Sequence, residues 1–454
     1  MLLSTLRRSL LSLGLLAAGL VTQAWAQGTI NLFRSVAPPS GLVSNPAEAL
    51  GMRSETVGAV SYVALTVEAA NYFRTRSLAP ETMQIALPGG GDSVVCAFSS
   101  EVTTDGLIVM RGTPTGGGIG DRCQLVVEDG RVTGIIDVPR GRYAIRPLEA
   151  ADMHAVVQVR TEAFPDELEA RAIAAQDPGT GRRNVPMCDV PIRQGQQPKT
   201  FGPIRVMIAY TPAAKRESRS ITADIQIMIQ QLRDVFSPRL TGGNFSVSAE
   251  LAHSVEVNYR EETDSPNMSK DLDRLSNRQD PIFGAIHRLR DTYKADLVHL
   301  VIKGRRNDDC GVGWMSRDIT RIGDDLGFSL SDRSCAVDNY SFAHELGHNL
   351  GMNHDRYVVE KMPRPEDKPQ PGEFNFGYVL LQHGVRDTMA YNDVCKAAGK
   401  NCRRLLVYSN PNMQWTNPAT GAQNVPLGRP LNARDAAYNA EVLCRTAGVI
   451  ARFR

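Results

Sequence analysis

Residues 343–355 read AHELGHNLGMNHD, and this stretch carries the strongest structural signal in the chain. Its first half predicts a helix on which His344 and His348 are four residues apart, so they lie on one face, one turn apart. Gly351 can adopt positive φ and would turn the chain sharply after the second histidine. That turn would return His354 to the first two. The stretch therefore predicts a helix, a tight turn and three imidazoles directed at one point.

Three converging histidines predict a catalytic metal site. They leave the fourth zinc position to water, which is typical of a catalytic rather than a structural site. Glu345 adjoins the first histidine and can face that position. One zinc ion would lower the pKa of the water. Glu345 would accept its proton as the hydroxide attacks a carbonyl, and would then deliver the proton to the leaving amine. Histidines placed by chance would not explain a polar His-Glu-His face beside apolar Phe342, Leu346 and Leu350.

The HExxHxxGxxH pattern resembles that of the metzincins, zinc endopeptidases with a methionine turn after the active-site helix. Residues 387–391, DTMAY, resemble that turn, which implies that Met389 lies beneath the zinc as an apolar floor. Tyr391 lies where serralysins and astacins have a tyrosine near the metal. This implies that it helps to hold the oxyanion, and a purely structural tyrosine is the alternative. Asp355 resembles the reprolysin group, because astacins have glutamate at that position.

Segments 341–351 (SFAHELGHNLG), 388–391 (TMAY) and 408–411 (YSNP) together resemble bacterial peptidyl-Asp metalloendopeptidases, which cut on the amino side of aspartate. The resemblance spans roughly residues 200–454. It implies a cation in the pocket for the residue after the scissile bond, a pocket that the methionine-turn region lines in metzincins. Each available cation could instead be a solvated surface charge. The candidates are Arg386, Lys396, Arg403 and Arg404.

Residues 200–454 are expected to form an α/β (α+β) catalytic domain with a mixed, twisted sheet and the active-site helix. The strand at 311–315 resembles the metzincin edge strand that binds extended substrate backbone, and a plain core strand is the alternative. The predicted elements are strands at 204–210, 245–251, 297–302, 311–315 and 326–330, and helices at 221–236, up to 289, and at 432–453.

Residues 27–199 are expected to precede this domain as an inhibitory propeptide. Between residues 55 and 160, apolar runs alternate with glycine-rich turns, which predicts a β-rich domain. A polar linker follows from about residue 176 to 199 and contains Arg182-Arg183, an accessible processing site. In this linker, Cys188 resembles a cysteine switch, whose thiolate would fill the fourth zinc position and keep the zymogen latent. A disulfide to Cys444 is the alternative.

Residues 1–26 are typical of a signal peptide. A basic pair at residues 7–8 precedes an apolar run over 10–21, and AWA at 24–26 is a cleavage signature. The run is shorter than the ~20 residues of a membrane span. We therefore expect a secreted protein, extracellular or periplasmic, in which disulfides are possible. The expected pairs, which leave Cys444 unexplained, are Cys96–Cys123, Cys310–Cys335 and Cys395–Cys402.

The charge pattern limits the partners. A net charge of +2 without blocks of like charge argues against a nucleic-acid partner. Protein or peptide substrates and the chain's own propeptide are expected, with no membrane span in the mature chain. Asp308-Asp309 and Asp324-Asp325 could bind calcium, although paired surface aspartates are common. The alternative functions are a processing protease or toxin with one protein target, or an inactive metal-binding module. The presence of Glu345 counts against the inactive module.

Overall fold

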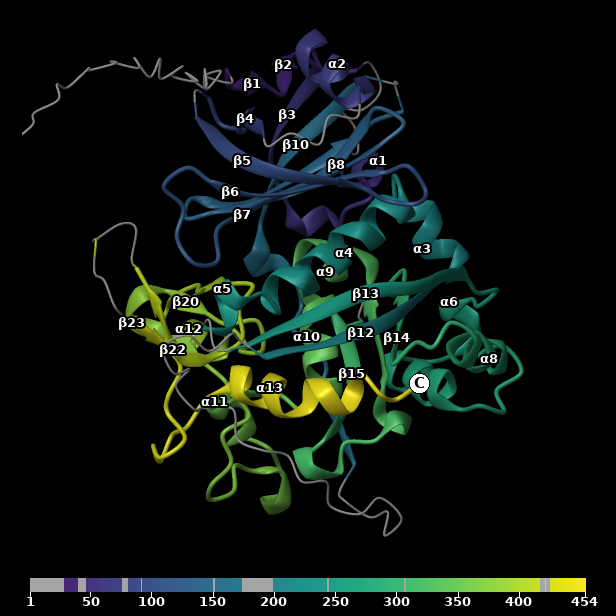
Figure 1. The fold of residues 1–454 in the computed structure, drawn as a ribbon, viewed down its shortest axis with the longest axis vertical. Coiled ribbons are helices and arrows are strands. Elements are labelled where there is room, and N and C mark those ends of the chain that lie inside the picture. The colour runs from purple at the N-terminus through teal and green to yellow at the C-terminus, as the bar shows by residue number, and fades with distance from the viewer. Residues whose placement is uncertain are drawn as a thin grey trace, which may run out of the picture.

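The computed structural model describes residues 28–39, 46–75, 81–90, 92–149, 152–173, 199–242, 245–305, 308–416, 421 and 425–454. These residues form two parts, each built on its own large sheet, and Figure 1 shows them stacked along the long axis of the molecule. The predicted signal peptide, most of the linker and Cys188 lie outside the described residues.

The N-terminal part is a ten-stranded sheet with the order β1-β4-β5-β6-β7-β8-β9-β10-β3-β2, which confirms that this region is β-rich. Strands β4 to β10 are consecutive antiparallel neighbours. Residues 30–35 pair at both ends of the sheet, because β1 adjoins β4 and β2 adjoins β3. The strands are β1 (Ile30–Asn31), β2 (Phe33–Ser35), β3 (Val57–Leu65), β4 (Glu81–Ala86), β5 (Ser93–Val102), β6 (Ile108–Pro114), β7 (Arg122–Glu128), β8 (Arg131–Val138), β9 (Gly141–Pro147) and β10 (Met153–Val159), with helices α1 (Pro46–Leu50) and α2 (Val67–Thr75).

The C-terminal part contains a six-stranded sheet with the order β11-β15-β16-β14-β12-β13. The sheet is mixed, as predicted, because β15 is antiparallel to β16 whereas the other neighbours are parallel. Every residue of β14 is buried, which explains its unbroken apolar run. The strands are β11 (Arg171–Ile173), β12 (Lys199–Tyr210), β13 (Phe245–Glu256), β14 (Leu297–Ile302), β15 (Gly311–Ser316) and β16 (Phe328–Asp332).

Helices and short strands complete this part. The predicted helices at 221–236 and 432–453 are present, but the second begins at Asn439. The preceding residues instead form a turn, bridged between Arg429 and Ala437 and containing Pro430. The elements are α3 (Pro212–Glu217), α4 (Ile221–Val235), α5 (Pro238–Thr241), α6 (Glu261–Asp264), α7 (Met268–Ser276), α8 (Gly284–Thr292), α9 (Arg333–Asp338), α10 (Ser341–Asn349), α11 (Arg356–Val359), α12 (Asp393–Ala397), α13 (Asn439–Ile450), β17 (Asn353–Asp355), β18 (Phe376–Gly377), β19 (Val379–Leu380), β20 (Val385–Arg386), β21 (Arg403–Arg404), β22 (Asn410–Trp415) and β23 (Val425–Leu427).

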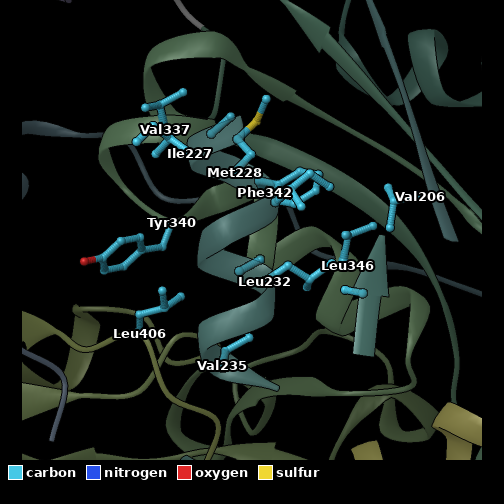
Figure 2. Packing of buried hydrophobic residues seen from close by; sticks show 14 of the residues in the cluster. Val206, Ile227, Met228, Leu232, Val235, Val337, Tyr340, Phe342, Leu346 and Leu406 are labelled. Atoms are coloured by element: carbon cyan, nitrogen blue, oxygen red, sulfur yellow. The ribbon is translucent and has the colours of Figure 1, made fainter. Parts of the chain in front are cut away.

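Helix α4 connects the two parts. It packs against β7 and β8 on one side and against α10 and β13 on the other. Its apolar residues belong to one buried cluster with the apolar side of α10, and Figure 2 shows Met228 and Leu232 in that cluster together with Phe342 and Leu346. The side of α10 that carries no predicted ligands is therefore packed in the largest hydrophobic cluster of the described residues.

Strand β11 is an element that the sequence did not predict. It belongs to the N-terminal part of the chain but adds to the C-terminal sheet, parallel to β15, with Arg171 opposite Trp314. Without β11, β15 is the edge strand of its sheet, as the resemblance implied. The edge expected to bind substrate backbone is thus paired with the chain's own segment.

The disulfides are those predicted, with one addition. Cys96–Cys123, Cys310–Cys335 and Cys395–Cys402 are all formed. Cys444, which the sequence left unexplained, is also disulfide-bonded. Among the described residues, the helices are too short or too polar to cross a membrane.

Candidate active site

Helix α10 is positioned at its start by the N-terminal sheet. It begins directly after Tyr340, which adopts a left-handed conformation with φ of 65°. The Tyr340 hydroxyl donates to the Asp137 carboxylate of β8, and the Arg142 guanidinium of β9 lies 3.7 Å from the centre of its ring. Burial raises the pKa of Asp137, but Arg403, Arg142 and this hydroxyl together lower it to about 2. An ionised carboxylate of the N-terminal part therefore holds the residue from which the helix starts.

The three predicted histidines meet at one point. The Nε2 atoms of His344 and His348 are 3.0 Å apart, and that of His354 lies 3.2 Å and 3.0 Å from them. All three side chains are fully buried. Gly351, with φ of 93°, makes the turn that returns the third histidine to the helix. Among the described residues, this is the group of three or more potential ligands that could hold a metal ion.

The Nδ1 atom of each histidine ring also has a hydrogen-bond partner. The Nδ1 atoms lie 2.9 Å from the Thr388 carbonyl, 2.8 Å from the Met352 carbonyl and 3.1 Å from Glu169 Oε2. Partners of this kind fix the tautomer and orientation of a zinc-bound histidine. Burial, followed by the charge of a neighbouring histidine, lowers the pKa of His344 and His348, which favours the neutral form that binds metal. The residues therefore fit a zinc ion.

Met389 packs against α10 at Gly347. A Cβ atom on Gly347 would lie 2.5 Å from Met389 Sδ, so only glycine allows this close approach. Asp355 links the third histidine to the same turn, because its carboxylate accepts from the backbone N–H of Tyr391 at 2.9 Å. The Tyr391 ring centre lies 4.1 Å from that of His354.

Glu345 is buried beside the histidines, and neither carboxylate oxygen has a hydrogen-bond partner among the described residues. Burial, then the charge of Glu167, raises the pKa of this carboxyl well above its usual range. Two glycines of β15 leave room for it, since a Cβ atom on Gly311 would lie 2.6 Å from Glu345 Oε1. The carboxylate thus has unused acceptors at the position where a water molecule would be activated.

Residues 164–169, FPDELE, cross this site, and we call them the acidic segment. Its backbone is bonded to the start of β15. The Leu168 N–H donates to the Gly311 carbonyl at 2.8 Å, and the Cys310 N–H donates to the Asp166 carbonyl at 3.0 Å. The Tyr391 hydroxyl donates to the Glu167 carbonyl. The acidic segment therefore occupies space in front of the histidines and leads into β11.

The Glu167 side chain enters the interior of the C-terminal part. Its Oε1 accepts from Ser341 Oγ and from Arg404 Nη1, each at 2.6 Å, and both ionic side chains are 1% exposed. Burial raises the pKa of Glu167, but Arg404, Ser341 and Arg386 together lower it below its usual value. Sequence reasoning missed this residue. Three acids within six residues are equally typical of a solvated loop, so the sequence offered no distinguishing signal.

The four candidate cations have different surroundings. Arg403 pairs with Asp121 and Asp137 of the N-terminal part at 2.7 Å and 2.9 Å. Lys396 is half-exposed and pairs with Asp166 at 3.1 Å. Arg386 donates to the Ala390 carbonyl, and burial lowers its pKa to about 10. Arg404 is the one of the four whose guanidinium reaches both Glu167 and His344, the latter at 2.6 Å from Nη2.

The two aspartate pairs that could have bound calcium contact arginines instead. The Asp308 carboxylate accepts from Arg305 at 2.8 Å, and Asp324 pairs with Arg454. Arg305 and Arg454 therefore supply the positive charge that a calcium ion would otherwise provide.

Comparison with known proteins places the site in context. Residues 200–396 match the reprolysin-like family of M12B metallo-peptidases. The chain is 27% identical over 467 residues to the peptidyl-Asp metalloendopeptidase of Stenotrophomonas maltophilia (strain K279a), covering 98% of this chain and 99% of that protein. It is also 27% identical over 336 residues to the enzyme of that name from Xanthomonas campestris pv. campestris, covering 73% and 69%. The solved metalloproteinase-II from Bacteroides fragilis is similar over 63% of this chain and 84% of its own, at 14% identity and a TM-score of 0.40, which is too low to carry an argument.

Proposed function

We propose that the chain is a metalloendopeptidase of the reprolysin-like type, which hydrolyses internal peptide bonds with one zinc ion held by His344, His348 and His354. The observation that carries the proposal is the convergence of three buried Nε2 atoms beside a carboxylate with two unused oxygens. When bound, zinc supplies a Lewis acid that polarises the scissile carbonyl and lowers the pKa of a water molecule.

The other side chains of the site have separate roles in the proposed reaction. Glu345 is the general base, which takes a proton from the attacking water and returns it to the leaving amine. Tyr391 is a hydrogen-bond donor to the carbonyl that becomes the oxyanion, since its hydroxyl already donates to a backbone carbonyl of the acidic segment. Met389, Gly351 and Asp355 hold the ligands in place without touching substrate.

The uncut chain is a latent form in this proposal. Residues 1–26 are a signal peptide for export, residues 27–199 are the inhibitory propeptide and residues 200–454 are the endopeptidase domain. The support is steric, because the acidic segment and β11 occupy the front of the histidines and the edge of the sheet. Cys188 lies outside the described residues. Its thiolate switch is not part of this proposal, because Cys444 is disulfide-bonded while the other six described cysteines pair among themselves. Within the described part, the carboxylate of Glu169 contacts a ligand histidine.

Cleavage on the amino side of aspartate is the substrate preference that we propose. The support is the name shared by the two relatives and the buried cations beside the methionine turn. The test is digestion of a denatured protein mixture by mature enzyme, with the new termini mapped by mass spectrometry. Chelated, zinc-restored and Glu345→Gln samples are the controls. Products that begin with aspartate, absent in the chelated and mutant samples, are expected. An absence of cleavage after verified propeptide removal and zinc loading would overturn the proposal.

A further inference from the structure

We propose that Arg404 is the residue that recognises an acidic side chain of the substrate, and that Glu167 occupies this pocket as a substitute in the uncut chain. This inference rests on the proposed endopeptidase function. It assigns the specificity of that site to one of four candidate cations, and it assigns the acidic segment to the position of a bound peptide.

The first support is that Glu167 is bound through two groups that a substrate residue would also present, a backbone carbonyl and a side-chain carboxylate. The Glu167 backbone carbonyl accepts from the Tyr391 hydroxyl, and its carboxylate accepts from Ser341 and Arg404. Ser341 is the first residue of α10, three positions before the first ligand histidine. The pocket therefore lies between the start of the active-site helix and the methionine turn, next to the reacting atoms.

The second support is the surroundings of Arg404. Apart from Glu167, its hydrogen-bond acceptors among the described residues are the Thr388 and Asn339 carbonyls, and its Nη2 also contacts the His344 ring. These three groups are neutral, so the guanidinium charge is balanced by Glu167. When the acidic segment leaves, a buried cation remains without a counter-ion, which strongly favours its replacement by another carboxylate.

The third support is the exclusion of the other cations. Arg403 and Arg404 are successive residues of β21, so their side chains point to opposite sides, and Arg403 faces Asp121 and Asp137 of the N-terminal part. Lys396 is half-exposed, so water screens its charge. Arg386 donates to the Ala390 carbonyl, whereas the Glu167 carboxylate accepts from Arg404. Only Arg404 combines full burial with a carboxylate partner inside the site.

The pocket also distinguishes a carboxylate from an amide of the same shape. The arginine and Ser341 Oγ are both donors to the Glu167 carboxylate. Both donors bind the same oxygen, Oε1, so an asparagine or glutamine side chain could offer its amide oxygen there but would leave the arginine charge unbalanced. The expected substrates are therefore peptides with an ionised side chain at this position, and the comparison of aspartate with glutamate is part of the test.

The experiment uses mature enzyme prepared from the full chain, in wild-type, Arg404→Gln and Arg404→Lys forms. Arg403→Gln is the matched control, because it removes the neighbouring arginine that faces away from the site. Four peptides differ only in having Asp, Asn, Glu or Ala after the scissile bond, and kcat/KM is measured for each. The zinc content of every preparation is measured as well, because Arg404 also contacts a ligand histidine.

Arg404→Gln is expected to lower the Asp-to-Asn ratio of kcat/KM by roughly 10- to 150-fold, the worth of a hydrogen bond to a charged group. Arg404→Lys should retain part of the ratio, and Arg403→Gln should leave it unchanged. A ratio that is unchanged in Arg404→Gln, at wild-type zinc content, would overturn the inference while leaving the endopeptidase proposal intact.

A binding measurement keeps the inference testable even if cleavage is absent. A labelled peptide of residues 164–173 and its Glu167→Gln form are titrated onto the zinc-loaded enzyme by fluorescence anisotropy. The wild-type peptide should bind more tightly, and Arg404→Gln should remove the difference. Equal binding of the two peptides to wild-type enzyme would refute the assignment of Glu167 to this pocket. Failure of zinc-dependent cleavage alone would instead refute the proposed function.

Discussion

Replacing Glu167 by glutamine in the uncut chain should release the acidic segment from the site. The Glu167 and Arg404 side chains are each 1% exposed, and their N–O distance is 2.6 Å. Glutamine keeps the shape of the side chain but removes its charge, so Arg404 stays buried without a counter-ion. Breaking a buried pair by removing one partner costs about 3–5 kcal/mol. At about 1.4 kcal/mol per factor of ten, the ratio of covered to open site should fall roughly 100- to 5,000-fold.

The neighbouring residue supplies the matched control. Asp166 pairs with Lys396 at 3.1 Å, and these side chains are 31% and 50% exposed. An exposed pair contributes about 0–1 kcal/mol, so Asp166→Asn should change the same ratio by no more than about fivefold. The two variants alter adjacent carboxylates of one segment and differ chiefly in burial.

The assay is the initial rate of cleavage of an internally quenched peptide by the uncut chain, with gel analysis to verify that the propeptide is still attached. Wild-type protein should be nearly inactive, Glu167→Gln clearly active and Asp166→Asn close to wild type. The reasoning is refuted if Glu167→Gln is as inactive as wild type, or if both variants are activated equally. Equal activation would mean that backbone contacts to β15, and not the buried pair, hold the segment.

Three further predictions concern the metal site, pH and a disulfide. Glu345→Gln should retain one zinc per chain, by metal analysis, but lose hydrolysis by at least roughly 100-fold, the usual contribution of general-base catalysis; loss of zinc together with activity would argue for a structural role. His154 accepts from the Val132 N–H and burial lowers its pKa from 6.5 to about 4. The unfolded chain therefore binds the extra proton first, and urea unfolding at pH 7 and pH 4.5 should show stability falling as pH drops below 6.5, by up to about 3 kcal/mol; a His154→Gln variant with the same pH slope would contradict this. Replacing both Cys310 and Cys335 by alanine removes a crosslink across 25 residues and should cost about 3.5 kcal/mol of unfolding free energy, with unchanged stability as the contrary result.

Features that depend on local geometry were predictable. The spacing of the histidines on a helix, the positive φ of Gly351 and the apolar run of β14 are each decided within one element. Sequence reasoning therefore placed the three histidines and Glu345 side by side, as the structure does. It also identified the N-terminal part as β-rich. The position of α13 was less accurate, because amphipathic spacing continued into residues that a proline turn removes from the helix.

Features that depend on long-range pairing were not predictable. Glu167 contacts residues 174 and 237 positions away in the chain, so no local pattern marks it. The same holds for β11, whose three residues acquire strand structure only by pairing with β15.

Two adjacent arginines, Arg403 and Arg404, show most clearly what the sequence determines and what the tertiary structure determines. The sequence by itself determined that cations are available near the methionine turn, because their identity and number are written in it. It could not tell Arg403 from Arg404. Both lie in β21, where successive side chains point to opposite sides. Which side faces the N-terminal carboxylates and which faces the zinc histidines is decided by the pairing of β21 with β20. That pairing exists only in the tertiary structure, because it joins segments whose register no short-range preference determines.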